Sequence, residues 1–187
     1  MSPYPKQPQI SAIPFQTFIA EFSALVDTNA GETHILQSGK RLLSDLVKTD
    51  DWLPDSLAKP HPQYYQQYLL YCDPEARFCV VSFVWEPGQE TPIHNHMVWG
   101  LLGQLRGRET STDYDRNMHQ TGEAILKPGD VAAVSPTIGD IHKVRNSDDG
   151  ISVSIHVYGA DIGKVERAVF DPESGASKPF ISGYANA

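Results

Sequence analysis

The sequence predicts a mainly β fold, a small barrel or sandwich with α-helices of the N-terminal part packed on it. Two observations predict it. Apolar residues at helical spacing are confined to the first third of the 187 residues, and short β-rich runs separated by turn residues fill the remainder. Strands and helices do not alternate as they would in βαβ units. We expect one domain over residues 1–187, mainly helical over 1–60 and a β-barrel over 61–187.

Two amphipathic segments predict the helices. FQTFIAEFSALV at residues 15–26 and THILQSGKRLLSDLV at residues 33–47 each place apolar side chains three or four positions apart. Gly31 separates the two segments, and acidic residues with a proline at 50–54 mark the end of the helical part. Residues 63–71 fit a helix or a strand.

The β-rich part is a series of short runs in which β-branched and aromatic residues dominate. Gly, Pro, Asn and Asp lie between the runs, as is typical of turns. This spacing favours a sandwich or barrel with short connections. The expected strands lie within residues 77–85, 97–114, 123–127, 131–135, 142–146, 151–159 and 166–170.

Charge and composition narrow the classes of partner. A formal net charge of -8 argues against nucleic acid, because phosphate binding needs clustered Lys and Arg. No apolar run is long enough to cross a membrane, and the first fifteen residues lack the apolar core of a secretion signal. Cys72, expected in a turn, and Cys79 are interpreted as small buried residues of a cytoplasmic protein. The sequence leaves the oligomeric state open.

The stretch TPIHNHMVWG holds the first candidate site. Alternate residues of a strand share a face, so His94 and His96 can reach one metal ion, although two surface histidines would show the same spacing. The neighbouring residues resemble the two motifs of the cupin superfamily: Gly88, His94, His96 and Gly107 for the first, and Pro136, Gly139, His142 and Asn146 for the second. The resemblance implies a double-stranded β-helix, or jelly-roll, barrel in which His142 completes the metal site.

Gly100 departs from the cupin pattern, which commonly has a glutamate ligand at this place. Three neutral imidazoles leave the charge of a divalent metal uncompensated and leave coordination positions open. Such a site suits an anionic ligand such as a thiolate. A zinc hydrolase with three histidines is an alternative.

A polar strand face in ISVSIHVYG is the second candidate feature. Its residues Ser154, His156 and Tyr158 would be ordinary in contact with water and unusual inside a core. Together with HNH and the later His142, this run resembles the thiol dioxygenase family, which includes cysteine dioxygenase. Members of that family use ferrous iron and O2 to convert a small thiol carboxylate into a sulfinate.

The resemblance covers about residues 60–184 and implies specific roles. It implies that His94, His96 and His142 bind Fe(2+). It also implies that Ser154, His156 and Tyr158 form a hydrogen-bonded relay, with the Tyr158 hydroxyl near substrate and oxygen. Mammalian members have a cysteine at the place of Gly100 that crosslinks to the tyrosine, so Tyr158 is expected to stay unmodified.

Two residues bear on the substrate. Gln67 stands where mammalian cysteine dioxygenases have an arginine that binds the substrate carboxylate, and a glutamine there resembles the bacterial subgroup that acts on 3-mercaptopropionate. The resemblance implies that this subgroup holds the carboxylate with a later arginine, for which Arg167 in KVERAVFDP is the best match. Gln67 itself cannot supply the bidentate charged pair that an arginine can. A surface amide and a solvated charge are the simpler interpretations of these two residues.

The sequence therefore predicts an iron-dependent thiol dioxygenase that most resembles 3-mercaptopropionate dioxygenases, with a small thiol carboxylate and O2 as partners. L-Cysteine, or cysteamine held by a different anchor, is the alternative substrate. A non-catalytic metal-binding cupin is the alternative outside this class.

Overall fold

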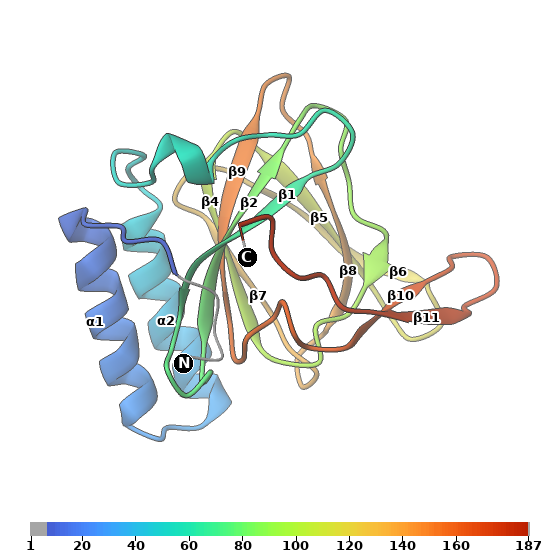
Figure 1. The fold of residues 1–187 in the computed structure, drawn as a ribbon. Helices are drawn as coiled ribbons and strands as arrows, with labels where there is room; N and C mark the ends of the chain where they lie inside the picture. The colour runs from blue at the N-terminus through green and yellow to red at the C-terminus, as the bar shows by residue number, and fades with distance from the viewer. Residues whose placement is uncertain (1–6, 187) are drawn as a thin grey trace.

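Two antiparallel sheets face each other and two helices cover one of them in the computed structural model, which describes residues 7–186 (Figure 1). Residues 1–6 and 187 lie outside the described residues, so part of the stretch that carries the secretion argument does too. Within residues 7–186, no helix is both long and apolar enough to cross a membrane.

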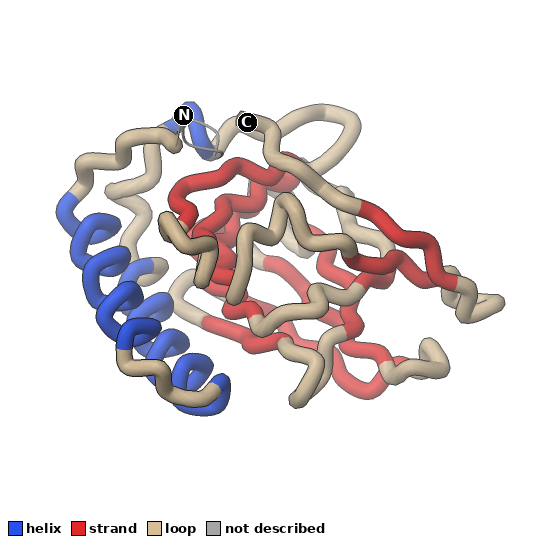
Figure 2. The backbone as a smooth tube through the Cα atoms, turned by 60° about the horizontal axis from the view of Figure 1, so that its bottom comes forward, coloured by secondary structure: helices blue, strands red, loops and turns tan. Residues whose placement is uncertain are grey.

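The helices form where the apolar spacing predicts them. They are α1 (Ile13–Asp27) and α2 (Glu32–Leu46), followed by the short 3-10 helix η1 (Asp55–Leu57). The apolar stripe of α1 buries Phe15, Phe18, Phe22 and Leu25. Figure 2 shows the two helices side by side along one flank of the strands. Because both contribute to one hydrophobic core with the sheet beneath them, their packing supports that sheet from outside.

The sheet under the helices has the order β1-β2-β9-β4-β7. Its strands are β1 (Gln66–Cys72), β2 (Cys79–Trp85), β9 (Ser152–Tyr158), β4 (Gly100–Arg106) and β7 (Val131–Val134). The facing sheet has the order β11-β10-β3-β8-β5-β6. Its strands are β11 (Ser177–Phe180), β10 (Arg167–Phe170), β3 (Ile93–His94), β8 (Ile141–Asn146), β5 (Glu109–Tyr114) and β6 (Gln120–Leu126).

The central strand β9 separates two environments. Its apolar residues Val153, Ile155 and Val157 belong to the core shared with the helices. Successive side chains alternate, so Ser154, His156 and Tyr158 point to the opposite face, inside the barrel. All three are at most 3% exposed. The polar face of this strand therefore lies in the interior and not in water.

Three details differ from the expectation or complete it. The ambiguous segment at residues 63–71 contributes strand β1. The expectation that Cys72 lies in a turn is wrong, since it is the last residue of β1 and pairs in register with Cys79. Both cysteines are free and buried, as expected, and burial raises the pKa of Cys72 to about 11. The strand expected to carry both His94 and His96 ends at His94 as β3, so His96 lies in the following loop. Strand β11 was not expected.

Candidate metal centre

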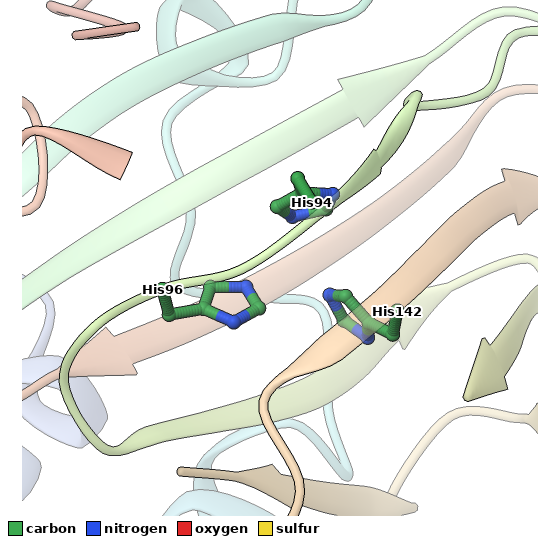
Figure 3. A group of neighbouring side chains, drawn as sticks. All are labelled: His94, His96 and His142. Atoms are coloured by element: carbon green, nitrogen blue, oxygen red, sulfur yellow. The ribbon is translucent and has the colours of Figure 1, made fainter. Parts of the chain in front are cut away.

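Three histidines from three neighbouring segments converge inside the barrel (Figure 3). His94 ends β3, His96 lies in the loop after it, and His142 is on β8, directly opposite His94 in the strand register. Their ring centroids are 4.8–4.9 Å apart. One ligand atom from each lies within 4.8 Å of the others. Three histidines at this separation could bind one metal ion.

Hydrogen bonds on the far side of each ring leave the same nitrogen available. The Nδ1 of His94 donates to the Pro92 carbonyl (3.0 Å), and the Nδ1 of His96 lies 3.1 Å from an Asp140 carboxylate oxygen. The Nδ1 of His142 lies 3.0 Å from the Ser111 hydroxyl. Such bonds set the tautomer and aim Nε2 at a metal. The buried Nε2 of His96 has no hydrogen-bond partner among residues 7–186, which fits a metal ligand.

Burial keeps the imidazoles in the form that binds metal. Burial lowers the pKa of His94 and of His142 well below the ordinary value, and the neighbouring histidines add to the effect. Both rings are therefore neutral at physiological pH, with a lone pair on the free nitrogen. A divalent cation is a suitable group for three such nitrogens.

Asp140 holds the loop that carries His96. Besides its contact with the His96 ring, its carboxylate accepts the backbone N–H groups of His96 (3.1 Å) and Met97 (3.0 Å). Met97 has a positive φ of 64°, a conformation that costs energy for a residue with a side chain. These bonds stabilise the turn, so Asp140 positions His96 through both its ring and its backbone.

A cavity of about 260 Å³ opens beside the histidines. This is smaller than a typical pocket for a drug-sized ligand. Its lining includes His94, His142, His156, Tyr158, Gln67 and Arg167. Among the described residues that line it there is no Asp or Glu. The cavity is therefore suited to a small ligand and carries no negative side chain.

Arg167 is a buried cation in this cavity. It is 5% exposed, and it forms no ion pair with a carboxylate among residues 7–186. Its Nη2 donates to the Ser182 hydroxyl (2.6 Å), its guanidinium lies 4.6 Å from the centre of the Phe180 ring, and its Nε has no partner. Burial lowers the pKa of Arg167, yet it stays charged because an arginine does not deprotonate in proteins. A buried charge without a counter-ion is costly, and an anionic ligand would supply the missing partner.

The chain segment at residues 182–186 forms the wall next to Arg167. Ser182 also accepts a hydrogen bond from Gln67 Nε2 (3.1 Å), which donates to the Gly183 carbonyl as well (2.9 Å). Gln67 is therefore held in place and is not a free surface amide. The side chain of Asn186 pairs with both backbone groups of Leu69 at 2.9 Å, so the segment covers the edge of β1.

Behind the histidines lies a line of three hydrogen-bonded side chains on β9. The Tyr158 hydroxyl is 2.8 Å from His156 Nδ1, and His156 Nε2 is 2.9 Å from the Ser154 hydroxyl. The Tyr158 ring stacks on His96 with centroids 5.5 Å apart. Gly100 makes this possible, because a Cβ there would lie 2.8 Å from two carbons of the Tyr158 ring. The phenol is thus placed against the metal centre.

The structure brings together most of the residues that the sequence singled out. Six of the eight line one cavity; His96 completes the triad from behind, and Ser154 lies behind His156. Sequence reasoning missed Asp140, Ser111 and Ser182. The only available signal was that Asp140 lies two residues before His142 in GDIH, which does not indicate a contact with His96.

No protein-family model matches the chain. Among solved structures it is similar to a conserved protein with a double-stranded β-helix domain from Klebsiella pneumoniae, with 21% identity, a TM-score of 0.51, and coverage of 62% of this chain and 86% of that one. A cupin superfamily protein from Desulfitobacterium hafniense is 18% identical, with a TM-score of 0.46 and coverage of 61% and 96%. Likeness at these identities concerns the fold alone. With the topology of the two sheets, the first of these likenesses shows a double-stranded β-helix fold, and the three histidines inside it could bind a metal.

Proposed function

We propose that the protein is a non-haem iron thiol dioxygenase that converts a small thiol carboxylate into a sulfinate, with 3-mercaptopropionate as the preferred substrate. One observation carries the proposal: Arg167, buried and without a carboxylate partner among residues 7–186, lines the same small cavity as His94 and His142, which with His96 bring their ligand atoms within 4.8 Å of one another. A ligand with a carboxylate at one end and a metal-binding group at the other satisfies both. The resemblance in the HNH and SIHVYG motifs supports a thiol as that group.

Different side chains around the cavity bind different parts of the substrate. Arg167 pairs with the substrate carboxylate through the guanidinium N–H groups that remain after one N–H of Nη2 has bonded to Ser182. Ferrous iron, when bound by the histidines, supplies the electron density and the open positions for chemistry between a thiolate and O2. Tyr158 presents its hydroxyl to the cavity and exchanges hydrogen bonds with the reacting group. Aromatic and aliphatic side chains around the cavity exclude water from it.

The charge of the cavity favours 3-mercaptopropionate over the amine-bearing thiols. L-Cysteine and cysteamine carry an ammonium group, which would need an acceptor of negative charge. The described lining contains no Asp or Glu, and Arg167 is itself positive. Burying an unpaired ammonium near a guanidinium is unfavourable. The preference for 3-mercaptopropionate therefore follows from the absence of a negatively charged side chain in the described lining.

The test is product formation with a panel of thiols. Iron-loaded protein is given 3-mercaptopropionate, L-cysteine and cysteamine at equal concentration, and sulfinate and oxygen consumption are measured together. We expect sulfinate from 3-mercaptopropionate in equal amount to the O2 consumed, and loss of both in His142→Ala. His119→Ala, an exposed histidine (79% of its side chain), serves as the matched control. Faster turnover of L-cysteine would contradict the preference, and activity with zinc but independent of O2 would favour a hydrolase.

A further inference from the structure

Glu109 is a buried carboxyl that reaches from one sheet to the other at the inner end of the barrel. It begins β5 and is 2% exposed. Its Oε1 accepts hydrogen bonds from Ser152 (3.0 Å) on β9 and from Gln104 (3.3 Å) on β4. No Lys or Arg among residues 7–186 forms an ion pair with it. Neither iron binding nor carboxylate binding uses this group.

Glu109 lies at the end of the line formed by Tyr158, His156 and Ser154. Ser154 is the register partner on β9 of Gln104, which donates to Glu109. Its hydroxyl lies 2.9 Å from His156 Nε2 and, on the other side, lowers the pKa of Glu109 by hydrogen bonding. A serine hydroxyl has one proton, so it can donate to only one of these neighbours. The charge of Glu109 decides which, because an ionised carboxylate only accepts.

Each charge state of Glu109 therefore orients every proton in the line. With the carboxylate ionised, Ser154 donates to Glu109, His156 donates from Nε2 to Ser154, and Tyr158 donates to His156 Nδ1. With Glu109 protonated, each bond reverses. His156 then carries its proton on Nδ1, and the Tyr158 hydroxyl is free to donate into the cavity.

We propose that Glu109 is the proton store of this relay: a ligand proton released in the cavity passes through Tyr158, His156 and Ser154 and comes to rest on Glu109. For the thiol of the proposed function, on which this identification of the ligand rests, the S–H bond breaks and an O–H bond forms on Glu109. Each of the three intervening groups receives one proton and passes one on, so none changes its charge. The sulfur is left as a thiolate, next to a phenol that now donates to it.

The other groups of the line cannot hold the proton near neutral pH. Burial lowers the pKa of His156 to about 3 and raises the pKa of Tyr158 above its ordinary range, so both stay neutral. Burial raises the pKa of Glu109 to about 7, while its hydrogen bonds from Ser154, Ser152 and Gln104 lower it in part.

Among the described residues 7–186, no other titratable side chain contributes to the pKa shift of Glu109. Its register partners on β6 and β8 are Leu126 and Asn146. The groups that face it from β4 and β9 are the Gln104 amide and two serine hydroxyls. The guanidinium of Arg106, farther along β4, is paired with Asp50 at 2.6 Å.

The test reads the tautomer of His156 and does not depend on turnover. Full-length protein labelled with 15N in histidine and loaded with zinc, which is diamagnetic, is followed by long-range 15N–1H correlation spectra from pH 5.5 to 8.5. We expect the His156 proton on Nε2 at high pH and on Nδ1 at low pH, with a midpoint near the Glu109 pKa of about 7. The wild-type titration alone can refute the proposal: a single His156 tautomer across this range would overturn it.

Variants then assign the switch and link it to chemistry. In Glu109→Gln, His156 should keep one tautomer at all pH values, and kcat for thiol-dependent O2 uptake should fall by about 100-fold or more. The control is Glu123→Gln, which changes an exposed carboxyl on β6. It should alter neither the tautomer switch nor kcat. A switch that persists in Glu109→Gln would refute the assignment. If iron-loaded wild type forms no sulfinate from any thiol while the switch is intact, the proposed function fails and the assignment of Glu109 is supported.

Discussion

Replacing Arg167 with Ala removes the only buried cation that the described cavity lining offers to a substrate carboxylate. One N–H of its Nη2 is held by Ser182 and its Nε has no partner among residues 7–186, so guanidinium donors remain for the substrate. A hydrogen bond to a charged group contributes about 1.5–3 kcal/mol, and truncating a buried charged partner costs about 2–5 kcal/mol. We therefore expect the substitution to cost about 2–4 kcal/mol of binding free energy for 3-mercaptopropionate, which corresponds to a roughly 30- to 900-fold lower kcat/KM. Most of this change should appear in KM.

The assay compares two substrates in wild type and in Arg167→Ala. Oxygen uptake is measured with 3-mercaptopropionate and with its uncharged amide, which lacks the group that Arg167 binds. The substitution should affect the acid strongly and the amide little, and Arg108→Ala, an exposed arginine, should affect neither. Thermal denaturation checks folding, and no loss of stability is expected when an unpaired buried charge is removed. A KM change below about threefold (under 1 kcal/mol), or an equal effect on both substrates, would refute the anchoring role.

Three further predictions concern the groups around the centre. Asp140→Asn should weaken zinc affinity by about 10- to 100-fold, measured by chelator competition, because a metal-binding histidine loses its charged acceptor. Gly100→Ala should lower stability by about 1–3 kcal/mol and shift the ring of Tyr158, since the new Cβ would lie 2.8 Å from that ring; thermal denaturation measures this, with Gly150→Ala as control. The stability that Glu109 contributes is present below its ordinary pKa of 4.5 and is lost as the pH rises through about 7. The free energy of unfolding of Glu109→Gln should therefore exceed that of wild type by about 3 kcal/mol at pH 8 and by little at pH 4. Urea denaturation at the two pH values measures this difference.

Each of these has an outcome that contradicts it. Unchanged zinc affinity in Asp140→Asn would mean that the loop holds its histidine without the carboxylate. Equal stability of Gly100→Ala and Gly150→Ala would show that the Tyr158 ring has room to move. A stability difference for Glu109→Gln that does not vary with pH would mean that this carboxyl keeps an ordinary pKa.

The sequence predicts the parts of this structure that depend on periodicity and motif spacing. Apolar spacing locates both helices, and the resemblance to two known motifs, one around HNH and one around His142, implies the three histidines. Periodicity shows which residues share a strand face but not which face is enclosed, so the polar face of β9 stayed ambiguous. The same limit applies to Glu109, because the first five residues of its strand, ETSTD, are all polar, so no alternation shows which of them face the interior. Strand β3 has two residues, too few for any pattern to show.

Contacts between distant segments were the other part that no local pattern could indicate. Asp140 is 44 positions from His96, and Ser182 is 115 positions from Gln67. Both contacts exist because the folded barrel brings together segments that are far apart in the sequence: two loops for Asp140 and His96, and an irregular segment and β1 for Ser182 and Gln67. Their residue types, an acid next to a glycine and a serine near a proline, are also those of ordinary turns.

The segment at residues 182–186 offers a place where substitutions can alter the cavity. The helices and the inner strands bear the packing that stabilises the barrel, whereas Ser182 is exposed and touches both Gln67 and Arg167. Substitutions in exposed residues usually cost little stability. Replacing Ser182 with a larger or an acidic residue would alter the room and the charge next to Arg167 while the metal-binding strands stay as they are. New substrate ranges could therefore be selected in the laboratory by varying this short segment alone.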